Sequence, residues 1–269
     1  MNTEIYLNGI AVSDAVPKIL INGVTVEKPE IKTSFADRPF GGRVKNSIYR
    51  SFIKITLEAQ FRAVGKPILR AECVDRLNAW AAKPGYITLS NRPGKRIYAE
   101  CVQFASEGTL HKSAEVASVS FESVFSPYWE NEQPATALVV LPGGGETAEA
   151  EMNLECTYET PVSAAVTVRD TPIQSLTLRV GDTSITLESP ETADEEGNTF
   201  KEPFADANDT IEIIHDFGVM TITKNGIGIY SLLTPDSSDE LIAQPGINIV
   251  SVSASAPVTC VFKAHGRWV

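Results

Sequence analysis

The sequence has no run of about 18 apolar residues, the length that a helix needs to cross a bilayer, although 43% of its 269 residues are hydrophobic. We therefore expect no membrane span. The first four residues, MNTE, do not form a basic region followed by an apolar block. This predicts that the chain has no secretory signal. We therefore expect the protein to be made in a cytoplasm.

Cysteine is scarce and ungrouped. Four residues stand singly along the chain: Cys73, Cys101, Cys156 and Cys260. No C-x-x-C pair occurs, which argues against a zinc site and against thioredoxin-type chemistry. A lone thiol behaves as a small hydrophobic group, so we expect these side chains to be buried.

Catalytic patterns are missing as well. The three histidines are His111, His215 and His265. None of them belongs to an H-E-x-x-H motif, and no G-x-S-x-G motif or cofactor fingerprint occurs. The sequence thus predicts no catalytic site, no metal and no cofactor.

Positive charge is scarce in the second half. Residues 1–141 carry 17 basic and 14 acidic residues, a formal charge of +3, whereas residues 142–269 carry 6 and 20, a charge of −14. Such asymmetry suggests two domains with different surroundings. An acidic half of this size argues against wrapping nucleic acid.

One convincing helix is present, at residues 68–82. Leu69, Cys73, Leu77 and Trp80 recur every three to four residues and form one apolar stripe. Pro67 favours its start, and the Lys-Pro-Gly that follows favours its end. Residues 86–90 and 95–104 then read as a hairpin around an Asn-Arg-Pro-Gly turn.

The remaining pattern is β. Strict alternation over residues 48–62 predicts one long half-buried strand. Residues 18–26 suggest a hairpin with its turn at Asn22-Gly23. Residues 35–44, rich in Gly, Pro and Arg, suggest a long ordered loop.

The triple glycine at 143–145 predicts a flexible joint. Beyond it, about eight alternating segments with regular turns indicate a β-sandwich. The insert at 188–202 is expected to be a loop. Its Asp194 to Gly197 stretch suits a solvated tip better than a calcium site, which needs alternating ligands. We predict domains at 1–141 and 147–269, joined by a linker at 142–146.

Several segments of the first half, taken in order, resemble the distal tail proteins of long-tailed siphophages. The order is RPFGGR at 38–43, a long strand, a helix ending L-x-x-W at 77–80, NRPGKRIYA at 91–99 and SPY at 126–128. In the second half, TIEI at 210–213, KNG at 224–226 and PGIN at 245–248 resemble the galectin-like second domain of that family.

This resemblance implies a mostly β protein with one helix. The first domain would be a tail-tube-like β-barrel or sandwich plus a helix, and the second a galectin-like antiparallel β-sandwich. Six copies would form a ring at the virion tail tip, made in the bacterial host cytoplasm. The implied partners are the tail-tube protein, the tail-tip protein and, in some relatives, a receptor-binding protein. No membrane and no sequence-specific nucleic acid is implied.

A ring needs head-to-tail contacts that close. The loop at 35–44 is our candidate contact, through Phe35, Arg38, Phe40 and Arg43. Solubility would explain the arginines of this loop but does not require its phenylalanines.

Other functions remain open. The main alternative is a carbohydrate-binding, galectin-like adhesion module, although the aromatic residues of the second half are not accompanied by a polar cluster. A tail-associated hydrolase lacks its catalytic residues in this sequence. Another tail or baseplate subunit of the same fold is also compatible with the pattern.

Overall fold

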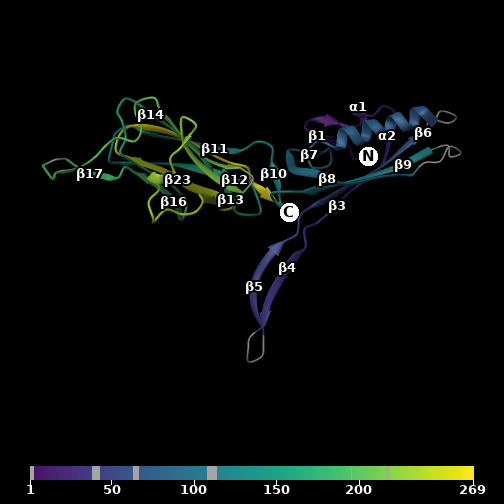
Figure 1. Ribbon diagram of the computed structural model, residues 1–269, viewed down its shortest axis with the longest axis horizontal. Helices are drawn as coiled ribbons and strands as arrows, with labels where there is room; N and C mark the ends of the chain where they lie inside the picture. The colour runs from purple at the N-terminus through teal and green to yellow at the C-terminus, as the bar shows by residue number, and fades with distance from the viewer. Residues whose placement is uncertain (1–2, 38–42, 63–66, 108–113, 195, 217) are drawn as a thin grey trace. The chain divides into compact units, whose positions relative to one another are not determined.

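The computed structural model describes residues 3–37, 43–62, 67–107, 114–194, 196–216 and 218–269. The chain divides into two compact units, Met1–Glu132 with Val269, and Gln133–Trp268. The prediction of a mostly β chain is confirmed (Figure 1).

The division falls earlier than the predicted linker at 142–146. Strand β11 (Ala135–Leu141) pairs along its whole length with β24 (Val258–Ala264) and so belongs to the second unit. The triple glycine connects β11 to β12 (Thr147–Leu154) inside that unit. The N–H of Gly145 donates to the carbonyl of Ala254 at 2.9 Å, which makes this segment an ordered turn.

The first unit is built on one antiparallel sheet, in the order β2-β1-β7-β8-β9-β6-β3, with β10 added beside β8. The strands are β1 (Ile5–Leu7), β2 (Ile10–Ala11), β3 (Ile19–Glu27), β6 (Lys54–Arg62), β7 (Gly85–Leu89), β8 (Lys95–Glu107), β9 (Ala114–Ser123) and β10 (Trp129–Asn131). A separate hairpin pairs β4 (Ile31–Asp37) with β5 (Arg43–Arg50).

Helix α2 (Pro67–Ala81) covers one face of this sheet (Figure 1). Its apolar stripe is buried at Cys73, Leu77, Trp80 and Ala81, which confirms the helix predicted from periodicity. A second helix, α1 (Val12–Ala15), was not predicted. It spans only four residues, too few for a periodic pattern to show.

Three local predictions were wrong. Asn22-Gly23 is not a turn. Strand β3 continues through these residues, and its register against β6 shifts between Ile21 and Gly23. The expected strand at 48–62 is two strands, β5 and β6, separated at residues 51–53. In the expected loop at 35–44, residues 35–37 belong to β4 and residues 43–44 to β5, because those segments pair with each other, and residues 38–42 lie outside the described residues.

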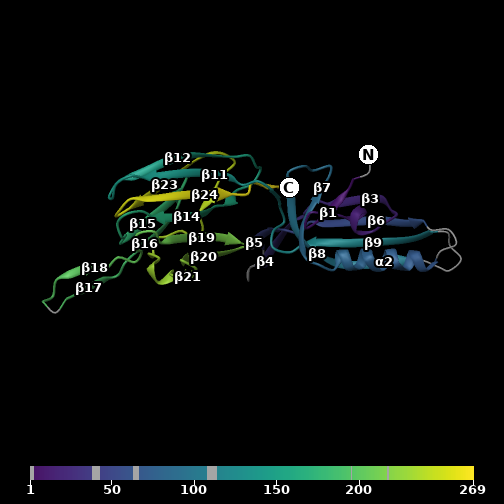
Figure 2. The ribbon, with the colours of Figure 1, turned by 90° about the horizontal axis from the view of Figure 1, so that it is seen from above.

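The second unit is a sandwich of two antiparallel sheets (Figure 2). One sheet has the order β11-β24-β14-β19-β20-β21 and the other β12-β23-β15-β16. Their further strands are β14 (Ser163–Val168), β15 (Ser175–Val180), β16 (Thr183–Glu188), β19 (Thr210–Asp216), β20 (Val219–Lys224), β21 (Ile227–Gly228) and β23 (Gly246–Ala254).

Short elements complete this unit. They are β13 (Thr160–Pro161) paired with β22 (Ile242–Ala243), β17 (Glu191–Ala193) paired with β18 (Thr199–Lys201), β25 (Arg267–Trp268) and a 3-10 turn at Tyr230–Leu232. The insert at 188–202, expected to be a loop, therefore carries a small hairpin that projects from the sandwich (Figure 2).

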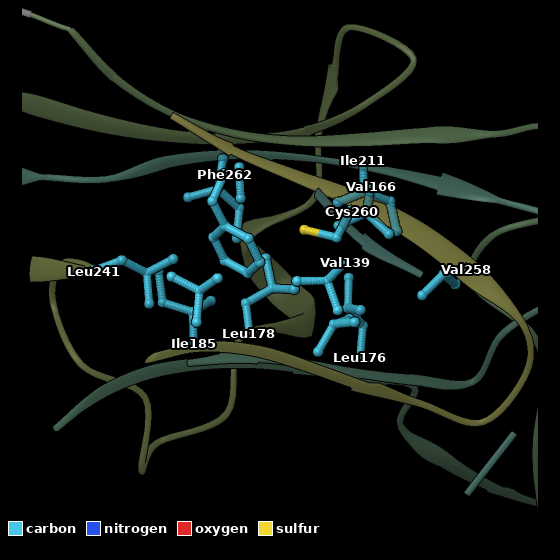
Figure 3. Packing of buried hydrophobic residues seen from close by; sticks show 14 of the residues in the cluster. Val139, Val166, Leu176, Leu178, Ile185, Ile211, Leu241, Val258, Cys260 and Phe262 are labelled. Atoms are coloured by element: carbon cyan, nitrogen blue, oxygen red, sulfur yellow. The ribbon is translucent and has the colours of Figure 1, made fainter. Parts of the chain in front are cut away.

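Side chains from both sheets meet in one apolar core. Phe262 on β24 points towards Leu178 and Ile185 of the opposite sheet, and all three are fully buried (Figure 3). Alternation along each strand places these residues inward and polar residues outward. Within the described ranges, no helix is both long and apolar enough to cross a membrane.

Candidate functional site

The β4–β5 hairpin carries Phe35 and Arg43, two of the four residues predicted to contact a neighbouring copy. Phe35 lies on β4 opposite Lys45, and Arg43 lies on β5 opposite Asp37. The pairing thus brings two of the four predicted residues onto neighbouring strands. Arg38 and Phe40 lie outside the described residues.

The base of this hairpin is held by hydrogen bonds. The N–H of Glu30 donates to Ser51 Oγ at 2.7 Å, and the N–H of Ser51 donates to the Glu30 carbonyl at 2.9 Å. Two apolar side chains beside this clamp face solvent, Ile31 at 63% exposure and Phe52 at 45%. An isolated two-stranded hairpin is marginally stable in water, and exposed apolar groups at its base favour contact with another surface.

The sheet face opposite α2 is polar. Alternation puts Lys54, Thr56 and Glu58 of β6 on this face, next to Ser120 and Glu122 of β9. The hydroxyls of Thr56 and Ser120 lie 3.2 Å apart and form a hydrogen bond. Buried apolar residues occupy the alternate positions, so this sheet has one dry face and one mainly polar face, which also exposes Leu20 and Val116.

Aromatic rings gather at one end of the polar face. The rings of Tyr86 and Tyr98, directly opposite on β7 and β8, meet edge-on with 5.4 Å between centroids. Phe125 lies 5.3 Å from Tyr98, and the guanidinium of Arg96 lies 4.1 Å above Tyr86. These contacts fix the side chains, so the cluster is a rigid part of the surface.

The outer face of the β12-β23-β15-β16 sheet is hollowed into a trough of about 560 Å³. We call this feature the sheet-face trough. Six polar side chains line it: Thr147, Glu149, Thr177, Arg179, Ser251 and Ser253. Ser251 and Ser253 on β23 are short, and the longer Glu149 on β12 and Arg179 on β15 flank Ser251, which creates the hollow.

The residues of the trough form two rows across the sheet. In one row, Glu149 pairs with Ser251, which pairs with Arg179. In the neighbouring row, Thr147 pairs with Ser253, which pairs with Thr177. Strand spacing separates the backbones of Glu149 and Arg179 by roughly 10 Å, with Ser251 as a floor between them.

The two charged groups of the trough are not paired with each other. Arg179 Nε donates to the carbonyl of Gly181 at 2.8 Å, which orients the guanidinium. Across the described ranges, neither a hydrogen bond nor an ion pair engages the carboxylate of Glu149. The trough therefore presents an acceptor and a donor group ready for a ligand. Sequence reasoning missed it because its residues come from three separate segments.

The scattered histidines and cysteines form no reactive group in the described part of the chain. Cys73 and Cys260 are buried as predicted, and burial raises the pKa of both thiols. Cys101 and Cys156 are only half-buried. His111 lies outside the described residues. No cluster of three or more metal-binding side chains is found within the described ranges.

The acidic tip of the small β17–β18 hairpin is internally hydrogen-bonded. The carboxylate of Asp194 accepts from the N–H groups of Glu196 and Asn198 and from the amide of Asn198, at 2.8–3.0 Å. These bonds hold the pKa of Asp194 below its usual value, with the side-chain amide of Asn198 as the largest cause. The carboxylate thus closes a turn, as the prediction of a solvated loop tip implies.

The fold is similar to that of two phage proteins. The Dit protein of phage SPP1, described as a paradigm of the hub adsorption apparatus in phages that infect Gram-positive bacteria, matches with a TM-score of 0.70 and 14% identity, over 100% of each chain. A chain of the phage P2 baseplate, described in its activated conformation with calcium, matches with a TM-score of 0.51 and 11% identity, over 99% of this chain and 98% of that chain. Family models and curated proteins give no match.

Proposed function

We propose that the chain is a structural distal tail protein of a long-tailed phage or prophage. In this proposal, six copies form a ring-shaped hub that joins the tail tube to the tail-tip or baseplate proteins. The observation that carries it is the similarity in fold to the SPP1 Dit protein over the whole of both chains. A single shared domain would support much less, since one fold serves many functions.

The β4–β5 hairpin supports assembly into a ring. A two-stranded sheet with exposed apolar residues at its base gains stability when a neighbouring surface covers it. A hairpin that contacts a different surface of the next copy makes a heterologous interface, which generates a ring when the rotation between copies closes. Phe35, Arg38, Phe40 and Arg43 are the proposed contacts.

The polar face of the first sheet suits the wall of a central channel. A channel wall stays hydrated in the assembled ring, so it needs polar side chains such as Lys54, Thr56 and Glu58. The dry face is covered by α2 within the same copy. The weak net charge of the first half also lowers repulsion among packed copies.

The proposed partners follow from this role. The ring would contact the tail-tube protein on one side and the tail-tip protein on the other, within the virion tail. The acidic second unit would be the part that meets a receptor-binding protein.

Native mass spectrometry with negative-stain images of the same sample tests the hub. We expect a mass six times that of one chain, and rings with an open centre, at a high protein concentration. A monomer at every concentration, both alone and in a mixture with its own tail-tube and tail-tip proteins, would overturn the proposal.

A further inference from the structure

We propose that the sheet-face trough is a binding site for a neutral saccharide chain, of the kind that covers bacterial cell surfaces. The proposal concerns the second unit alone and does not depend on the formation of a ring. It starts from the two rows of side chains that cross β12, β23 and β15.

The row of Glu149, Ser251 and Arg179 offers complementary groups on either side of a gap. A carboxylate accepts two hydrogen bonds at once from adjacent hydroxyls, and a guanidinium donates to ring or hydroxyl oxygens. The two charges balance, so the site favours a ligand without net charge. Ser251, at only 8% exposure, provides a small floor that leaves room between them.

The neighbouring row adds hydroxyl groups that a longer saccharide could reach from the charged row. Thr147 and Thr177 flank Ser253, roughly 7 Å along the strands from the charged row. Hydroxyls both donate and accept, which suits the mixed groups of a sugar. Ile249, two residues from Ser251 on β23 and on the other side of the charged row, is 46% exposed and offers an aliphatic surface for the apolar face of a sugar ring.

The same composition argues against a protein as the occupant. The cores of protein interfaces are enriched in aromatic residues, Met and Arg, and depleted in Ser and Glu. The trough has the opposite composition except for Arg179, and no aromatic side chain lines it. Its volume of about 560 Å³ falls within the range of small-ligand sites, roughly 300–1,000 Å³.

The experiment uses the full-length protein, fluorescently labelled, on an array of neutral oligosaccharides and bacterial surface polysaccharide fragments. The test variants are Glu149→Gln and Arg179→Gln. The matched controls are Glu212→Gln and Lys263→Gln, which remove one charge of each sign from the outer face of the other sheet. Native mass spectrometry of every variant records whether all share the same assembly state.

We expect binding by the unmodified protein, and a loss of about tenfold or more for each trough variant, because each loses hydrogen bonds to a charged group. The controls should bind as well as the unmodified protein. Binding that survives both trough variants would locate the saccharide elsewhere and overturn the proposal. An array with no bound member would overturn it too. Neither result bears on the hub, which the mass and the images test.

Discussion

The indole ring of Trp80 meets the ring of Phe121 edge-on, with 5.9 Å between centroids and 88° between ring planes. Trp80 lies on α2 and Phe121 on β9, so the contact joins the helix to the centre of the first sheet. Trp80 Nε1 also donates to the carbonyl of Ile10 at 3.2 Å. One side chain thus links the helix, the sheet and the N-terminal segment.

Replacing Trp80 with Ala should destabilise the first unit by about 3–5 kcal/mol, because it removes a large buried ring and leaves a cavity. Calorimetric unfolding should show the transition of the first unit moving to lower temperature, with the transition of the second unit unchanged. Ile68→Ala is the control: Ile68 lies on the same helix at 75% exposure and should change stability little. Equal effects of the two substitutions would contradict the proposed role of the ring contact.

The helix and most strands could be predicted because each buries one face only. Burial of Cys73, Leu77 and Trp80 on α2 repeats every three to four residues, and that period is visible in the sequence. The Asn225-Gly226 pair is likewise a hairpin-turn signal in the sequence, and both residues have the positive φ values, +48° and +81°, that such turns require.

Local sequence patterns gave wrong predictions where pairing between distant segments determines the backbone conformation. Asn22-Gly23 carries a turn signal, but eight residue pairs between β3 and β6 outweigh it and convert it to an irregularity in the strand. The break between β5 and β6 at residues 51–53 contains no Gly or Pro that would have predicted it. It exists because Ser51 bonds to Glu30 at the base of the hairpin, a contact between distant positions.

The sheet-face trough could not be predicted from the sequence. Each of its segments reads in the sequence as an ordinary strand with polar outward residues. Only the register of β12 and β15 against β23 puts Glu149 and Arg179 on either side of Ser251. Register depends on the whole sheet, so the sequence could predict a polar face but not a binding site.

Replacing Phe40 with Asp should abolish the ring, because a buried carboxylate without a partner opposes an apolar contact between copies. Native mass spectrometry would then record monomers where the unmodified protein gives the ring. Phe200→Asp is a matched control, since Phe200 is a 45% exposed phenylalanine on the small hairpin of the second unit. A ring that persists in the Phe40 variant would remove Phe40 from the proposed interface.

Substitutions in the glycine segment at 143–145 test whether it is an ordered turn or a flexible joint. A Cβ on Gly144 would lie 2.0 Å from the carbonyl oxygen of Ser255, whereas a Cβ on Gly143 would meet nothing within 4 Å. Gly144→Ala should therefore destabilise the second unit by about 1–3 kcal/mol through overpacking. Gly143→Ala should change stability by less than about 1 kcal/mol. Urea unfolding of the two variants measures the difference, and a flexible joint would tolerate both.

His215 gives the second unit a dependence on pH. Its ring is half-buried at the end of β19, and its Nε2 atom has no hydrogen-bond partner within the described ranges. Burial lowers the pKa of His215 below its usual 6.5; the nearby Arg267 acts in the same direction, and Glu240 opposes them. The folded protein thus keeps this ring neutral under mildly acidic conditions.

The sign of the effect follows from proton binding. Below about pH 6.5 the unfolded chain protonates His215 while the folded chain does not, so the unfolded state binds more protons. This contribution to stability is complete above pH 6.5 and declines as the pH falls from there towards the lowered folded pKa. Calorimetry between pH 7.5 and 5 should show the transition of the second unit moving to lower temperature. His215→Leu should reduce that shift because Leu binds no proton. An unchanged shift in the Leu variant would assign the pH dependence to other groups.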